Sequence, residues 1–204
     1  MFGKVASDVL GLSDIGIVIK PEDYDKVEAD DYIMHEDNEK IYFLIKSKSD
    51  EYCFTNFAFI HLDGTSATSK KRVLKRYDYY QHPIQNVTLE TAGTVDLDVE
   101  IKFTIGNEKY SIDVHKNHLE EVKDLYKTLI KIAEIHYDNS KAIHFAQQSI
   151  DLASTVLSKT HHNGGDLIQQ FKDINQISFS WLMNTHKQYH VKDFGHVFEK
   201  YIHN

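Results

Sequence analysis

The chain has 204 residues, 41% of them hydrophobic and 26% charged, with a formal net charge of −8 and a pI of about 5.9. This composition is typical of a soluble globular protein, argues against disorder, and the acidic balance argues against nucleic-acid binding. The single Cys53 excludes an intrachain disulfide, and no apolar run is long enough for a membrane span or a signal peptide, so we expect a cytoplasmic protein.

The first forty residues carry two features. Apolar residues at helical spacing predict an amphipathic helix over residues 1–12, which we expect to pack on the fold or on a neighbouring subunit rather than on a membrane. Residues 21–40 are rich in Asp and Glu. Because their spacing is not that of an EF-hand loop, we interpret them as a solvated surface and not as a metal site.

Residues 41–114 alternate apolar and polar side chains in runs of strand length. The predicted strands cover residues 41–46, 52–62, 73–80, 84–89, 95–103 and 110–114. Turns are expected at residues 47–50, at Asp63-Gly64, before Ile84 because of Pro83, and at Gly106-Asn107. Successive antiparallel strands of this length predict a curled sheet that forms a barrel or two packed layers.

Helical periodicity begins after residue 116. A helix over residues 119–137 is expected to close one end of the barrel, and Asp138-Asn139-Ser140 is expected to break it. A second helix over 143–157, a loop at 161–165, a return helix over 167–182 and a short helix near 191–201 follow. The expected packing residues of this hairpin are Ile143, Ala146, Ile150, Leu157, Phe171, Ile174 and Trp181.

A two-helix hairpin buries too little apolar surface to be stable alone. Its remaining apolar face must therefore pack on the sheet domain or on another chain. Both alternatives stay open at the sequence level, and we favour self-association.

Several phrases of the sequence resemble a known family. The stretches FTNFAFIHLDG, KKRVLKRYDYYQHPIQNV and LDVEIKFTIG, with the helix that follows them, are similar to bacterial pleckstrin-homology-like (PH-like) domains over roughly residues 1–138. Residues 139–204 resemble the helical oligomerisation extension of YvbH-like proteins. The resemblance implies an α+β fold, with a curled antiparallel sheet of about seven strands capped by a helix and followed by a helical hairpin. It also implies assembly into rings and no enzymatic activity.

A basic cluster lies between two of the predicted strands. It comprises Lys70, Lys71, Arg72, Lys75 and Arg76. Clustered cations can hold phosphate, so an anion or lipid-headgroup site is one interpretation. Carboxylates outnumber cations in the surrounding sequence, and neighbouring residues on a strand point to opposite faces. We therefore favour a solvated or ion-paired strand.

Histidines are the remaining candidates for chemistry. His186 and His190 are four apart, as two ligands of one metal ion on a helix would be, but no further ligand or H-E-x-x-H pattern completes a site. There is also no phosphate-binding loop and no nucleophile elbow. The sequence predicts no catalytic residues, no metal and no cofactor.

Two functional hypotheses remain. The first is a non-enzymatic scaffolding module that forms a homo-oligomer through its sheet domain and helical extension and leaves room for other protein partners. The alternative is a peripheral protein of anionic membrane surfaces, which the net charge disfavours.

Overall fold

The computed structural model describes residues 14–64, 72–91, 98–159 and 167–202. The predicted N-terminal helix over residues 1–12 lies outside these ranges. The described chain divides into two compact units, with boundaries after Ala133 and before Lys192. The first unit therefore combines the sheets with the C-terminal segment, and the described part of the second, residues 134–191, is almost entirely helical. The predicted domain boundary at residues 138/139 stays a prediction.

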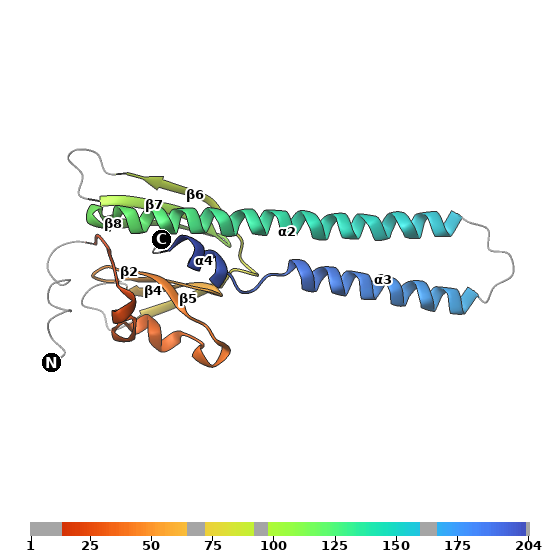
Figure 1. The fold of residues 1–204 in the computed structure, drawn as a ribbon, viewed down its shortest axis with the longest axis horizontal. Coiled ribbons are helices and arrows are strands. Elements are labelled where there is room, and N and C mark those ends of the chain that lie inside the picture. Colours follow the sequence, from red (N-terminus) through yellow and green to blue (C-terminus); the bar gives the residue numbers. More distant parts are fainter. Residues whose placement is uncertain (1–13, 65–71, 92–97, 160–166, 203–204) are drawn as a thin grey trace. The chain divides into compact units, whose positions relative to one another are not determined.

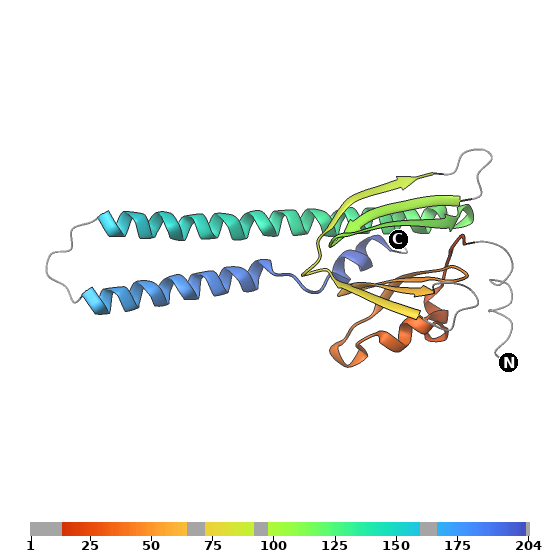
Figure 2. The same cartoon turned by 180° about the vertical axis from the view of Figure 1, so that it is seen from behind.

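The sheet unit has two antiparallel layers, which Figure 2 shows as separate sheets. The first has the order β1 (Ile17–Val18), β2 (Ile41–Lys46), β3 (Glu51–Thr55), β4 (Ala58–Gly64) and β5 (Arg72–Asp78). The second has the order β6 (Ile84–Glu90), β7 (Asp98–Ile105) and β8 (Glu108–His115). This arrangement, with the helices that follow, confirms the predicted α+β class.

The alternation in β7 shows why these strands form. Val99, Ile101, Phe103 and Ile105 are buried, while the residues between them face outward. The predicted turn at Gly106-Asn107 is confirmed, and Gly106 has a φ of 58°, which glycine adopts without a steric penalty. Between the layers, the ring of Phe59 lies 4.8 Å from that of Phe54 and 5.2 Å from that of Phe103, so aromatic side chains fill the core.

One predicted strand and one predicted turn are wrong. Asp63 and Gly64 belong to β4 and do not form a turn. Residues 52–62 form two strands rather than one, because the chain turns at Asn56-Phe57 between β3 and β4. The hydroxyl of Thr55 accepts hydrogen bonds from the backbone N–H groups of Phe57 (3.0 Å) and Ala58 (2.8 Å). A side chain thus replaces the backbone partners that a continuous strand would have had.

The acidic stretch forms three short 3₁₀ helices: η1 (Pro21–Lys26), η2 (Glu28–Tyr32) and η3 (His35–Asp37). A fourth, η4 (Lys116–His118), leads from β8 into the first long helix. Apolar residues of the acidic stretch, among them Val27, Ala29 and Ile33, pack with Leu44 and Ile60 in one core cluster. The charged side chains therefore cover an apolar underside.

Helix α2 (Leu119–Lys159) is continuous in Figure 1, so the predicted break at Asp138-Asn139-Ser140 is wrong. The hydroxyl of Ser140 donates to the carbonyl of Tyr137 (2.7 Å), a local bond that a helix tolerates. In the sheet unit α2 buries Val122, Leu125 and Leu129 completely. In the helical unit, residues 134–159 of α2 are followed by α3 (Leu167–Tyr189).

The C-terminal segment belongs to the sheet unit. Helix α4 (Gly195–Tyr201) and its flanks bury Phe194, Val197, Phe198 and Ile202. The ring of Phe198 stacks on Tyr42 at 5.2 Å, and Phe194 meets Tyr79 edge to face at 5.7 Å. Residues 194–202 therefore complete the core that the strands begin.

Candidate interaction surfaces

The packing residues predicted for the hairpin fall into two groups. Ala146 is buried and Ile143, Ile150 and Ile174 are half-buried, so these four lie on covered faces of their helices. Phe171 and Trp181, in contrast, are 70% and 50% exposed. The side chain of Leu157 lies outside the described residues. Their role as an oligomer interface stays a prediction.

A second apolar stripe runs along α3, which we call the outer stripe. Its apolar members are Ile168, Phe171, Phe179 and Leu182, and the first three are between 64% and 70% exposed. Side chains three, four, seven or eight apart share one helix face, so these residues form a continuous surface. Sequence reasoning found Phe171 and Leu182 and missed Ile168 and Phe179, although the spacing was readable.

Helix α2 has a comparable exposed surface within the helical unit. Tyr137, Phe145 and Leu152 are each more than 60% exposed. Their spacings of eight and seven residues place them on one face, nearly opposite Ile143, Ala146 and Ile150 on the helical wheel. Both long helices of the unit thus carry large apolar side chains that the single chain leaves in water, which is typical of an interaction surface.

The described members of the basic cluster are all ion-paired. Arg72 lies 3.4 Å from Glu28, Lys75 lies 3.5 Å from Asp63, and Arg76 contacts two carboxylates. Lys70 and Lys71 lie outside the described residues. Pairing of this kind is what the sequence analysis favoured for the strand, and an anion or lipid site here stays a prediction.

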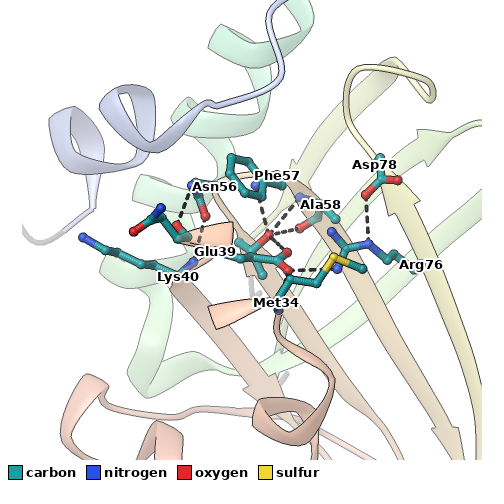
Figure 3. Close-up of polar contacts among 10 residues, drawn as sticks. Met34, Glu39, Lys40, Asn56, Phe57, Ala58, Arg76 and Asp78 are labelled. Atoms are coloured by element: carbon teal, nitrogen blue, oxygen red, sulfur yellow. Dashed lines mark hydrogen bonds and ion pairs between the residues drawn. The ribbon is translucent and has the colours of Figure 1, made fainter. Parts of the chain in front are cut away.

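Arg76 is part of a buried polar network drawn in Figure 3. Its guanidinium donates to Glu39 (3.0 Å) and to Asp78 (2.8 Å). The carboxylate of Glu39, which has no exposed side-chain surface, also accepts from the hydroxyl of Thr55 (2.6 Å) and the backbone N–H of Met34 (2.9 Å). This network joins the acidic stretch to three strands of the first sheet.

Asn56, also drawn in Figure 3, is a second polar junction. Its amide oxygen accepts from the backbone N–H of Lys40 (2.8 Å), and its amide nitrogen donates to Asp193 (3.1 Å). Its backbone carbonyl accepts from the N–H of Phe194 (2.8 Å). Asn56 therefore fastens the C-terminal segment to the sheet, which makes both polar networks elements of structure.

The chemically reactive groups are arranged for packing. Burial raises the pKa of the Cys53 thiol well above its ordinary value, which keeps it protonated at neutral pH. His61 and Asp50 are 2.9 Å apart, but the nearby hydroxyl of Ser49 donates to Asp50 and not to the imidazole. This is not the order of a nucleophile and its general base.

Neither a metal-binding cluster nor a membrane-spanning helix occurs among the described residues. Within one chain, they contain no group of three or more His, Cys, Asp or Glu side chains placed to hold a metal ion. Among the helices in the part of the chain that the structure describes, none is long and apolar enough to cross a membrane.

Comparison with known proteins identifies the family. The family model "Bacterial PH domain" matches residues 9–133. The chain belongs to the bacterial PH domain family. A second model, "YvbH-like oligomerisation region", matches residues 144–204 of this bacterial PH protein, which places α3 and α4 in that region.

Full-length relatives share both parts of this bacterial PH protein. The protein YvbH of Bacillus subtilis (strain 168) is 60% identical over 204 residues, all of both chains. The crystal structure of a PH domain containing bacterial protein from Exiguobacterium sibiricum 255-15 is 56% identical, with a TM-score of 0.85 over 93% of this chain and 100% of the other. The predicted combination of a PH-like domain with a YvbH-like helical extension is thereby confirmed.

Proposed function

We propose that the protein is a non-enzymatic scaffolding module that self-associates, with a second copy of the chain covering the outer stripe of α3. The observation that carries this proposal is the exposure of Ile168, Phe171 and Phe179 within a region that matches an oligomerisation family. Large apolar side chains gathered on one face lose favourable burial energy if nothing covers them. The sheet unit supplies the surface that the assembly presents to other proteins.

The choice of a second copy follows from the surface itself. The apolar members of the outer stripe carry no charge, and every copy of the chain has the same stripe. The stripes of two copies can therefore pack against each other. A symmetric pairing of this kind buries equal surfaces on both chains. The exposed residues of α2, Tyr137, Phe145 and Leu152, extend the available apolar area.

The test uses the full chain. Ending the chain at residue 138 would remove Phe194 and Phe198 from the core of the sheet unit, so a truncated protein would fail for reasons unrelated to association. We therefore choose the double substitution Phe171→Gln with Phe179→Gln. The matched control is Lys187→Gln, an exposed position on the same helix outside the stripe.

Size-exclusion chromatography with light scattering measures the outcome. We expect the unmodified protein to exceed the monomer mass of 23.7 kDa, the double variant to fall to a lower mass, and the control to keep the original one. Circular dichroism checks that the helices remain. A monomeric unmodified protein, or a double variant with unchanged mass, contradicts the proposal.

A further inference from the structure

The outer stripe of α3 also includes polar residues, and all of its residues follow one regular spacing. Successive positions are separated by 3, 4, 4, 3, 4 and 4 residues, an 11-residue repeat that keeps one face of a helix aligned over its whole length. The members in order are Ile168, Phe171, Asn175, Phe179, Leu182, His186 and His190. Four of the first five positions are therefore apolar, the third is Asn175, and the last two are histidines.

The two histidines lie side by side, with His186 in the last turn of α3 and His190 directly after the helix. Their ring centroids are 4.4 Å apart and their planes are within 21° of parallel. Imidazole nitrogens bind Zn²⁺ at about 2.0–2.1 Å, so two rings this close can contact one ion after small side-chain rotations. The C-terminus of a helix carries a partial negative charge, which favours a cation at this position.

One chain supplies only half of such a site. A structural Zn²⁺ site takes four ligands, and the described residues of a single chain hold no cluster of three. Among the described residues the histidine pair therefore needs further ligands, and the residues next to His186 and His190 on the stripe are the ones proposed to contact a second copy.

The pattern of the stripe selects a parallel arrangement. With a two-fold axis along α3, each residue meets its own counterpart, so Asn175 meets Asn175 and the histidine pairs meet each other. An antiparallel arrangement centred on Phe179 would place His190 against Ile168 instead. Moving a polar imidazole from water to an apolar surface has a desolvation cost, which disfavours this arrangement.

We propose that His186 and His190 form one half of a site for Zn²⁺ or a similar borderline divalent ion, and that the same pair of a second, parallel copy completes it with four imidazoles. This inference rests on the proposed self-association and deepens it. The ion fixes the register of the two α3 helices and stabilises the assembly, because it binds only when the two pairs meet.

Metal binding is tested on the full chain after treatment with a chelator. Calorimetric titration with ZnCl₂ is expected to give one ion per two chains. The variant His186→Gln with His190→Gln should bind at least about tenfold more weakly. The control His196→Gln, an exposed histidine on α4, should bind as the unmodified protein does. One ion per chain, or equal affinity in the double variant, would overturn the proposal.

Register is tested by crosslinking. Cysteines join only when their Cα atoms are closer than about 7 Å. The variant Asn175→Cys should form a disulfide-linked dimer on oxidation, and Zn²⁺ should speed its formation. The double variant Asn175→Cys with Met183→Cys reports the antiparallel alternative, because 175 would then face 183 of the second copy. Crosslinking only through the 175–183 pair would overturn the parallel arrangement.

The two proposals fail in different ways. If Phe171→Gln with Phe179→Gln lowers the mass but Zn²⁺ does not bind to the histidine pair, self-association stands and the metal site falls. If Zn²⁺ binds as proposed and the Phe171/Phe179 variant keeps its mass, the histidines hold the copies together without the apolar stripe, and the proposed function falls.

Discussion

Glu39 brings a charge into the interior of the sheet unit and depends on its partners there. Thr55, Met34 and Arg76 each donate a hydrogen bond to its carboxylate, which has no exposed side-chain surface. A buried charge that loses its counter-ion is more costly than the pair itself is stabilising, since the remaining charge is left without water or a partner.

Arg76→Met is therefore expected to destabilise the protein by about 3 kcal/mol, at the lower end of the range for a broken buried pair because Thr55 and Met34 still donate hydrogen bonds to Glu39. Urea unfolding followed by circular dichroism measures the change. Lys75→Met is the matched control, since it breaks the partly exposed pair with Asp63 and should cost within about 1 kcal/mol. Equal losses of stability in the two variants would show that Glu39 does not need the guanidinium of Arg76.

His136 links stability to pH. Burial lowers its pKa to about 4, below the ordinary value of 6.5, so the folded protein favours the neutral ring. The stabilisation that the neutral ring of His136 provides is fully present above about pH 6.5 and is lost as the pH falls toward 4. Between pH 7.5 and 5 we expect His136 to account for a loss of roughly 1–2 kcal/mol.

The variant His136→Gln should lack that part of the loss, because glutamine does not titrate. Urea unfolding at the two pH values gives the comparison, and His196→Gln at an exposed position should keep the full pH dependence. The prediction is wrong if both variants lose stability on acidification as much as the unmodified protein does.

At the scale of single elements, the outer face of the second sheet contains a repulsive contact. In the register of β7 and β8, Asp113 lies directly opposite Glu100. Burial raises the pKa of Asp113, and the charges of Glu100 and Asp98 raise it further. Like charges directly opposite each other destabilise a strand pair.

Asp113→Asn should therefore stabilise the protein at pH 7 by roughly 0.5 kcal/mol. Because the folded state raises the pKa of this carboxyl, its unfavourable contribution is present above the folded pKa and disappears as protonation proceeds at lower pH. Thermal unfolding at pH 7 and pH 3.5 measures both values. A gain that persists unchanged at the lower pH would mean that charge repulsion is not its cause.

The elements also show what the sequence could and could not predict. The alternation in β7 and the turn at Gly106-Asn107 were readable because they are local. The turn at Asn56 was not, since its side chain is held by Lys40 and Asp193, which are distant in the sequence. The weak helix propensities of residues 138–140 were overridden within a long helix that is packed at its start.

The same distinction applies to the candidate interface. Residues of two stripes alternate along α3 at spacings of three and four, and the sequence does not say which stripe the chain covers by itself. Ile174 was expected at an interface and is half-buried, whereas Ile168 and Phe179, which were not singled out, are exposed. Burial distinguishes Ile174 from the outer stripe, which periodicity does not, although Ile177 and Trp181 off the stripe are exposed as well.

The side chain of Asn56 holds the C-terminal segment against the first sheet. Asn56→Ala removes hydrogen bonds to both Lys40 and Asp193, and we expect the protein to lose about 2 kcal/mol of stability. The loss should be concentrated in the C-terminal segment. Amide hydrogen exchange at Val197 and Phe198 should accelerate more than exchange in β7, and uniform acceleration would argue that α4 unfolds only with the whole unit.

For the whole molecule, net charge decides between the proposed scaffold and a membrane-surface protein. The formal charge is −8, and the described basic residues Arg72, Lys75 and Arg76 are already paired with carboxylates. At about 10 mM salt the Debye length is about 30 Å, so an anionic surface senses most of the protein's charge and repels it. We expect vesicles rich in anionic lipid to leave the protein in the supernatant after sedimentation. Neutral vesicles serve as the control. Retention by the anionic vesicles that is lost in Lys71→Glu with Arg72→Glu would instead establish the basic cluster as a lipid contact, because only a local site can overcome the unfavourable total charge.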